Sequence, residues 1–186
     1  MAMFPAASRR RFAPGISSMP ALLATTSVAA LLLGTPLPAH AAGISVTGNA
    51  ANVDNPANTT VTSIVVNAAN VSGAVTNEGT VKPGKAVTVN GVTVTASVVV
   101  TNSTIGQGIA NSGTITASAQ GVTGIGILVS GSTISAIGIS NTNAINATSI
   151  GTAGGIAANA STVSGGVSNA NAITATGGDV AFAIRP

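Results

Sequence analysis

Large aliphatic side chains recur along the second half of this chain with a period close to thirty residues. They fall into three columns, which run Ile105, Ile134, Val163; Ile115, Ile145, Ile173; and Ile127, Ile156, Ile184, with 28 to 30 residues between successive members. In a parallel β-helix the inward side chains of successive coils stack directly over one another. The pattern therefore predicts an all-β fold, a parallel β-helix or β-solenoid with coils of about 28–30 residues.

One polar position also recurs once per repeat. It is occupied by Asn77, Asn111, Asn141 and Asn169. Stacked asparagine amides can bond to one another from strand to strand, so this column could form a hydrogen-bonded ladder. A solvent-facing Asx turn would place asparagine at the same position, and it stays open as the alternative.

The position two residues after each of these asparagines contains only glycine and asparagine. Its members are Gly79, Gly113, Asn143 and Asn171. Glycine and asparagine enter the left-handed region of backbone conformation more readily than other residues. This column predicts a structural corner with positive φ, repeated once in every coil.

The regularity varies along the chain and divides it into three parts. Residues 1–41 are predicted to be a signal peptide, residues 42–72 an N-terminal cap or irregular first coil, and residues 73–186 the β-helix repeats, incomplete at the C-terminus. Within the repeats, Lys82-Pro83-Gly84-Lys85 is predicted to be an interrupting charged turn. A last coil left without a cap exposes strand edges, which favours edge-to-edge association with other strands.

The N-terminal segment has the layout of a helical secretory signal. A basic stretch at Arg9-Arg10-Arg11 precedes the apolar run Ala21–Leu33, and Ala39-His40-Ala41 follows as a small-x-small cleavage site. We expect cleavage after Ala41 and export through the inner membrane. A membrane anchor is the alternative, which Pro36 and Pro38 soon after the run disfavour. The twin-arginine route and general secretion both stay open.

Removal of this segment changes the charge of the protein. The whole chain has a formal net charge of +3, but three cations (Lys82, Lys85, Arg185) and three anions (Asp54, Glu78, Asp179) remain after residue 41. No basic stripe with interleaved aromatic residues is left, so nucleic acid is not an expected partner. The chain contains no cysteine, so disulfides cannot stabilise the exported product.

Side chains that support catalysis are scarce after residue 41. This part contains no His, Cys, Tyr or Trp, and its three carboxylates belong to no motif. We therefore expect no enzyme activity, no cofactor and no metal site. Two alternatives remain: a secreted carbohydrate-active β-helix enzyme, which would gather Asp54, Glu78 and the lysines, and an ice-binding or self-assembling fibre, which would need a regular Thr or Asn face.

Three short sequence phrases of the repeat, together with the export signal and the sparse charge of the chain, point to a known family. They are Asn77-Glu-Gly-Thr-Val81, Asn111-Ser-Gly-Thr-Ile115 and Asn169-Ala-Asn-Ala-Ile173. Residues 74–186 resemble the passenger region of bacterial autotransporters, the type V secretion family. The resemblance implies a right-handed parallel β-helix that reaches the cell surface, the outer membrane or the extracellular space through a translocator barrel, which is expected downstream of these residues.

The function implied is a non-catalytic, surface-exposed or secreted scaffold, an adhesin-like fragment with an unspecified ligand on a host or cell surface. Recognition in such a scaffold is expected on loops inserted between coils. The repeat pattern indicates almost no such insertion.

Overall fold

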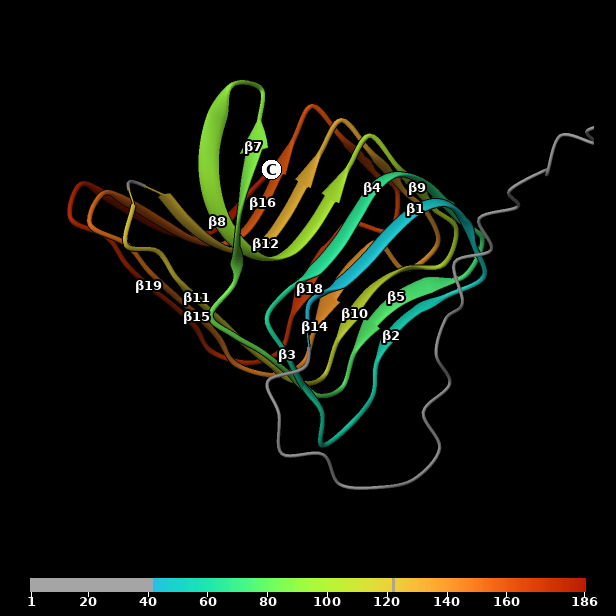
Figure 1. Cartoon of the computed structure of the whole chain (residues 1–186), viewed down its shortest axis with the longest axis horizontal. Helices are drawn as coiled ribbons and strands as arrows, with labels where there is room; N and C mark the ends of the chain where they lie inside the picture. The colour runs from blue at the N-terminus through green and yellow to red at the C-terminus, as the bar shows by residue number, and fades with distance from the viewer. Residues whose placement is uncertain (1–41, 122) are drawn as a thin grey trace, which may run out of the picture. The chain divides into compact units, whose positions relative to one another are not determined.

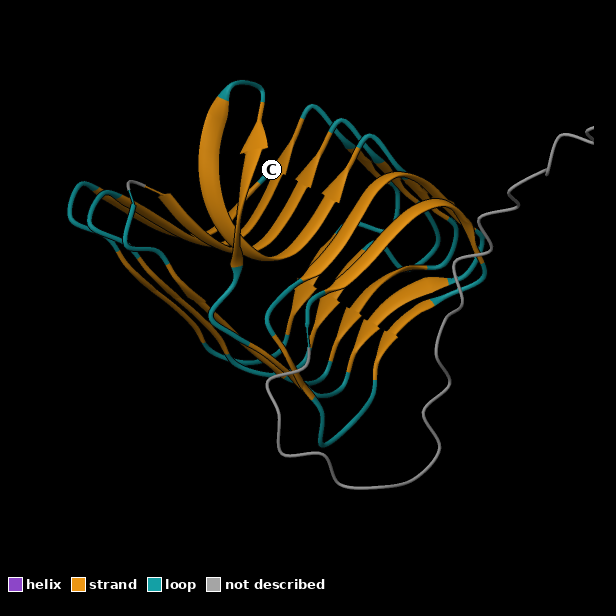
Figure 2. Cartoon of the chain, viewed as in Figure 1, coloured by secondary structure: helices purple, strands orange, loops and turns teal. Residues whose placement is uncertain are grey.

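The computed structural model describes residues 42–121 and 123–186. These residues form strands and connecting turns without any helix (Figure 2), and none of their segments is a helix long and apolar enough to cross a membrane. The predicted signal peptide, residues 1–41, and its predicted cleavage residues Ala39 and Ala41 lie outside the described residues.

The strands follow one another in successive circuits of the chain, each of which we call a coil. The first coil contains β1 (Ile44–Ala50), β2 (Val53–Asn55) and β3 (Thr60–Val61), and the second contains β4 (Ile64–Val71), β5 (Ala74–Asn77) and β6 (Thr80–Val81). The third contains β8 (Val92–Thr101), β9 (Thr104–Ile105), β10 (Gly108–Asn111) and β11 (Thr114–Ser118). The fourth contains β12 (Thr123–Ser130), β13 (Thr133–Ile134), β14 (Ile139–Asn141) and β15 (Ile145–Thr148). The fifth contains β16 (Thr152–Asn159), β17 (Thr162–Val163), β18 (Val167–Asn169) and β19 (Ile173–Thr176), and β20 (Val180–Arg185) follows it.

Three sheets collect equivalent strands from successive coils (Figure 1). One five-stranded sheet has the order β2-β5-β10-β14-β18, and another has the order β3-β6-β11-β15-β19. The third sheet has ten strands and contains β1, β4, β8, β12, β16 and β20 together with β9, β13, β17 and β7 (Lys85–Val89). Apart from the antiparallel pair of β7 with β8, every strand pair is parallel. The chain is therefore an all-β protein of stacked parallel strands, consistent with a β-solenoid.

Strand register aligns the aliphatic columns that the sequence predicts. Ile134 pairs with both Ile105 and Val163, Ile145 with both Ile115 and Ile173, and Ile156 with both Ile127 and Ile184. The pairing continues upstream through Val71, Val81 and Val98 into residues 42–72. A fourth column, which the sequence did not predict, contains Val53, Val75, Ile109, Ile139 and Val167.

The coils differ in length more than the repeats indicate. Along the asparagine column, successive members are 22, 34, 30 and 28 residues apart, beginning from Asn55. The last two intervals agree with the expected 28–30 residues, whereas the first coil is shorter and the second interval is longer. The longer interval includes an inserted hairpin.

The hairpin consists of β7 and the first half of β8, joined by Asn90-Gly91 (Figure 1). Both turn residues have positive φ, 50° for Asn90 and 80° for Gly91. Two adjacent left-handed residues match the twist of the flanking strands, and Asn-Gly is the favoured sequence for such a turn. The expectation that the coils have almost no insertion is wrong, because this stretch is a strand pair and more than a charged turn.

The large sheet is buried on both faces where the hairpin meets it. Val98 and Val100 point into the main core between the three sheets, while Ala96 and Val99 belong to a second apolar cluster with Val94, Ile125, Leu128 and Ala157. Partly buried Val87 and Val89 of the hairpin pack against that second cluster. This explains the run of consecutive buried residues in β8, which simple alternation does not predict.

Candidate functional site

The predicted asparagine column is a continuous chain of hydrogen bonds in the structure. The Nδ2 of Asn77 donates to the Oδ1 of Asn111 at 2.6 Å, Asn111 to Asn141 at 2.6 Å, and Asn141 to Asn169 at 2.6 Å. Asn55 adds one further rung, because its Nδ2 donates to the Oδ1 of Asn77 at 2.7 Å. The ladder thus crosses all five coils.

Two inner rungs of the ladder, Asn111 and Asn141, are also hydrogen-bonded to the backbone of their own coil. Asn111 donates its second amide hydrogen to the carbonyl of Gly113 at 2.9 Å, and Asn141 donates to the carbonyl of Asn143 at 2.6 Å. Asn141 is fully buried, so these bonds satisfy a side chain that would otherwise be costly to remove from water. A net contribution of about 0.5–1.5 kcal/mol per bond makes the ladder a substantial link between coils.

The predicted left-handed corner is wrong. None of its four positions, Gly79, Gly113, Asn143 and Asn171, has a positive φ. Glycine is needed at Gly79 and Gly113 because the backbone of the preceding coil lies too close for a side chain. A Cβ at Gly113 would lie 1.9 Å from the carbonyl oxygen of Gly79, and a Cβ at Gly79 would lie 2.4 Å from that of Thr59.

Asparagine occupies the same column in later coils for a different reason. The Nδ2 of Asn143 donates to the carbonyl of Ser112 at 2.8 Å, and its Oδ1 accepts from the backbone amide of Ala144 at 2.7 Å. Asn171 repeats this arrangement with Thr142 and Ala172. The column therefore changes from close backbone approach in the earlier coils to a side-chain bridge in the later coils, and both arrangements favour the residue types from which a corner was predicted.

The left-handed corner occurs elsewhere, beside a serine ladder that the sequence analysis missed. Positive φ is found at Ala68, Asn102, Gly131 and Ala160, one per coil. The next residue in three of these coils is Ser103, Ser132 or Ser161. The hydroxyl of Ser103 accepts from the backbone amide of Ala69 at 3.1 Å, and Ser132 accepts likewise from Ser103 at 3.1 Å.

The same hydroxyls donate within their own coil. Ser103 donates to the carbonyl of Thr101 at 2.7 Å, and Ser132 to that of Ser130 at 2.9 Å. The phrase Ser-Thr-Ile or Ser-Thr-Val, repeated at residues 103, 132 and 161, is the sequence signal that could have revealed the ladder. The third position of this phrase belongs to a predicted aliphatic column, whereas no role was predicted for its serine.

The acidic and basic side chains do not gather into a cluster. Asp54 and Glu78 lie on neighbouring coils, where the Asp54 carboxylate accepts a hydrogen bond from the hydroxyl of Thr76. Within residues 42–121 and 123–186, no carboxylate forms an ion pair with Lys82, Lys85 or Arg185. The same residues contain no group of three or more potential metal ligands among His, Cys, Asp and Glu.

The last coil has exposed positions where earlier coils are buried. Val163, Val167 and Ile173 are only partly buried, and Ile184 is 39% exposed. Arg185 lies over the ring of Phe182, with its guanidinium carbon 4.7 Å from the ring centre. The backbone edges of β17, β18, β19 and β20 have no strand beyond them among the described residues.

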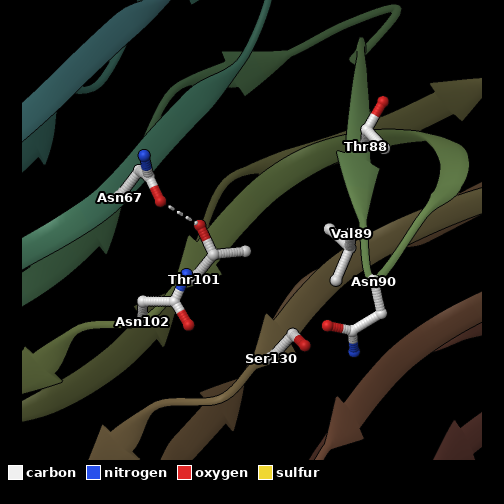
Figure 3. Close-up of a pocket in the computed structure, with 7 residues that line it drawn as sticks. All are labelled: Asn67, Thr88, Val89, Asn90, Thr101, Asn102 and Ser130. Carbon is white, nitrogen blue, oxygen red and sulfur yellow. Dashed lines mark hydrogen bonds between the residues drawn. The ribbon is translucent and has the colours of Figure 1, made fainter.

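A polar pocket of about 100 Å³ lies between the hairpin tip and the large sheet (Figure 3). The residues that line it are Asn67, Thr88, Val89, Asn90, Thr101, Asn102 and Ser130. They come from β4, the hairpin, the end of β8 with the turn after it, and β12. Sequence analysis identified none of them, because the pocket exists only where the hairpin folds back toward strands of two other coils.

Comparison with known proteins adds no family to these observations. No protein-family model, no curated protein and no solved structure matches the chain.

Proposed function

We propose that this chain is a non-catalytic β-helix scaffold, exported and displayed at the cell surface or secreted, as an adhesin-like part of an autotransporter passenger. The main support is the continuity of its columns, because aliphatic and asparagine positions repeat from the first coil to the last. In structures of this kind each repeat contacts mainly its neighbouring repeats, so the stack can be extended in one dimension. A rod of stacked coils suits display of a ligand-binding surface away from the membrane.

The sparse chemistry of the described coils agrees with a scaffold. The carboxylates are dispersed, and Asp54 is occupied by a threonine hydroxyl on the next coil. Interior polar groups are satisfied by structural ladders, and no side-chain nitrogen or oxygen atom of the described residues that is itself completely shielded from solvent lacks a hydrogen-bond partner. Polar residues of the core therefore serve to hold coils in register.

Export and display are tested most directly in the source organism. We expect the mature chain to begin at about Ala42, to leave the cytoplasm, and to be digested by protease added to intact cells. Deletion of the apolar run Ala21–Leu33 should retain the protein inside the cell. Recovery of the intact, undigested chain from the cytoplasm of unmodified cells would contradict the proposal.

The exposed edge of the last coil supports one further element of this proposal, association through that edge. Strand edges without a partner are templates for pairing with other strands. We expect self-association of the purified protein to rise with concentration and to fall in Ile173→Lys, which places a charge at the open end of a core column. Ser45→Lys, on exposed β1 at the other end, is the matched control and should not change it. Sedimentation velocity measures both, and equal behaviour of the two variants would contradict association through the last coil.

A further inference from the structure

The pocket under the hairpin tip is lined mostly by polar residues, some of whose side chains have no hydrogen-bond partner among the described residues. Ser130 is only 4% exposed, yet its hydroxyl forms no hydrogen bond with any described residue. Its carbonyl, in contrast, accepts from the backbone amide of Asn102 at 3.0 Å and from the hydroxyl of Ser132 at 2.9 Å. The backbone of Ser130 is thus held in place while its hydroxyl remains available at the pocket wall.

The opposite walls supply further free hydrogen-bonding groups. The hydroxyl of Thr101 donates to the Oδ1 of Asn67 at 2.8 Å, which leaves the Nδ2 of Asn67 as a donor without a partner (Figure 3). Asn90 extends from the hairpin tip on the side of Ser130, and its amide also has no partner among the described residues. Ser130 and Asn90 therefore offer unbonded polar groups close to each other on one side of the pocket, while the Nδ2 of Asn67 on the other side points away from them (Figure 3).

The hairpin fixes this arrangement before any ligand arrives. Asn90 is held in the left-handed region by the Asn-Gly turn, and five cross-strand residue pairs connect β7 to β8. Val87 and Val89 anchor the hairpin against the second apolar cluster. A preorganised site avoids part of the ordering cost of binding.

The lining decides which ligand chemistry fits. No Lys, Arg, Asp or Glu lines the pocket, so neither phosphate, carboxylate nor a cation would find a countercharge. Six of the seven lining residues are Asn, Thr or Ser, which disfavours a purely apolar ligand. Val89 adds one apolar surface, against which carbon-bound hydrogens of a ligand could pack. A neutral ligand rich in hydroxyl groups satisfies all three conditions.

The size of the pocket limits the ligand further. One water molecule needs about 10–15 Å³ on this measure of volume. A pocket of about 100 Å³ therefore accommodates about the bulk of one sugar ring. We propose that it binds a single neutral sugar unit, through the Ser130 hydroxyl and the Asn90 amide. This inference rests on the proposed scaffold role in one respect only: the sugar is expected to be bound and not chemically converted.

The proposal is tested by titrating the isotope-labelled full-length chain with a panel of neutral methyl glycosides, those of glucose, galactose, mannose and N-acetylglucosamine. We expect saturable changes in the NMR signals of the Asn67, Asn90 and Asn102 side-chain amides with at least one of them. Ser130→Ala should weaken that binding about five- to tenfold, because one hydrogen bond is lost. Asn90→Gly keeps the left-handed turn, removes the amide and should weaken binding similarly.

Matched controls separate binding from folding. Ser140→Ala, on half-buried Ser140 of β14 outside the pocket, should leave the affinity for the glycoside unchanged. Unfolding midpoints of Ser130→Ala and Ser140→Ala should equal that of the original chain, because neither hydroxyl bonds to a described residue. Absence of saturable changes with every glycoside, equal affinity in Ser130→Ala, or binding of a Gly-Ser-Gly peptide alone would overturn the proposal. These outcomes leave export and surface display untouched, so the two proposals fail independently.

Discussion

The first and last coils use the same columns but differ in how those columns end. In the first coil Val53 and Val61 are 2% and 5% exposed, although no strand lies beyond them among the described residues. Their counterparts in the last coil, Val167 and Ile173, are only partly buried. The comparison teaches that equivalent residues in a stacked fold are not equally buried, even where both lie in an end coil with one neighbouring coil among the described residues.

The asparagine ladder differs at its two ends in the same direction. At the first rung the Oδ1 of Asn55, a buried residue, accepts from the hydroxyl of Thr59 at 2.5 Å, so the last acceptor of the ladder has a partner. At the last rung Asn169 is exposed, and its amide donates to Asn171 but to no further asparagine of the described residues. Among the described residues, the ladder thus ends on a bonded acceptor in the first coil, which we call the closed end, whereas the last coil, which we call the open end, leaves a donor and four aliphatic columns uncovered.

The close approach of backbones differs between the two halves as well. Gly79 and Gly113 occupy one column near the closed end, and Asn143 and Asn171 occupy it near the open end. We expect Gly113→Asn to destabilise the protein by more than about 4 kcal/mol, because a Cβ there meets the backbone carbonyl of Gly79. Urea unfolding followed by circular dichroism measures this loss.

The reverse substitution provides the control. Asn143→Gly removes the bridge to Ser112 without adding an atom, and we expect it to cost about 1–2 kcal/mol. Similar losses of unfolding free energy in Gly113→Asn and Asn143→Gly would mean that glycine and asparagine are interchangeable along this column. That result would contradict the difference between its two halves.

Sequence analysis predicted the parts of the fold that depend on burial alone. The aliphatic columns follow from inward side chains that recur at the same place in each coil, and residue type and spacing in the sequence indicate them directly. The corner at Gly79 and Gly113 was placed wrongly because glycine occurs both where φ is positive and where another backbone lies close. A single sequence does not separate these causes, since the second depends on a contact 34 residues away.

The pocket lay beyond sequence reasoning for a related reason. Asn90-Gly91 indicates a hairpin, but nothing local indicates that its tip faces Asn67 and Ser130 from other coils. Serine and asparagine are common in this chain. Only the three-dimensional structure therefore distinguishes a serine whose hydroxyl is unbonded from a serine of the ladder. Ser130 and Ser132 are two residues apart, and only the second has hydrogen-bond partners for its side chain.

The next largest difference between the middle and the open end is expected in the core. Ile145 is completely buried, so Ile145→Ala should cost about 2–5 kcal/mol through lost burial and a residual cavity. Ile173→Ala in the same column should cost less than half as much, because Ile173 is already partly exposed. Chemical denaturation of the two variants under identical conditions measures the ratio, and equal losses would show that the last coil is as well packed as the fourth.

A smaller difference is expected along the asparagine ladder. Asn111→Ala leaves the Nδ2 of Asn77 and the Oδ1 of Asn141 buried without partners, at a cost of about 2–3 kcal/mol. Asn169→Ala removes a partner only from Asn141, at the exposed end of the ladder, and should cost about 1 kcal/mol or less. Thermal unfolding distinguishes them, and a larger loss at Asn169 would place the anchor of the ladder at the open end.

The serine ladder should show the same gradient with the smallest amplitude. Ser132→Ala leaves the buried backbone amide of Ser103 without its acceptor, and we expect a loss of about 1 kcal/mol. Ser161 accepts from the backbone amide of Ser132 at 3.2 Å but is itself half-buried, so water can replace its hydroxyl and Ser161→Ala should cost less. Amide hydrogen exchange at Ser103 and Ser132 reports each bond separately. Faster exchange at Ser103 in Ser132→Ala, with little change at Ser132 in Ser161→Ala, is expected if solvent substitutes for protein bonds toward the open end.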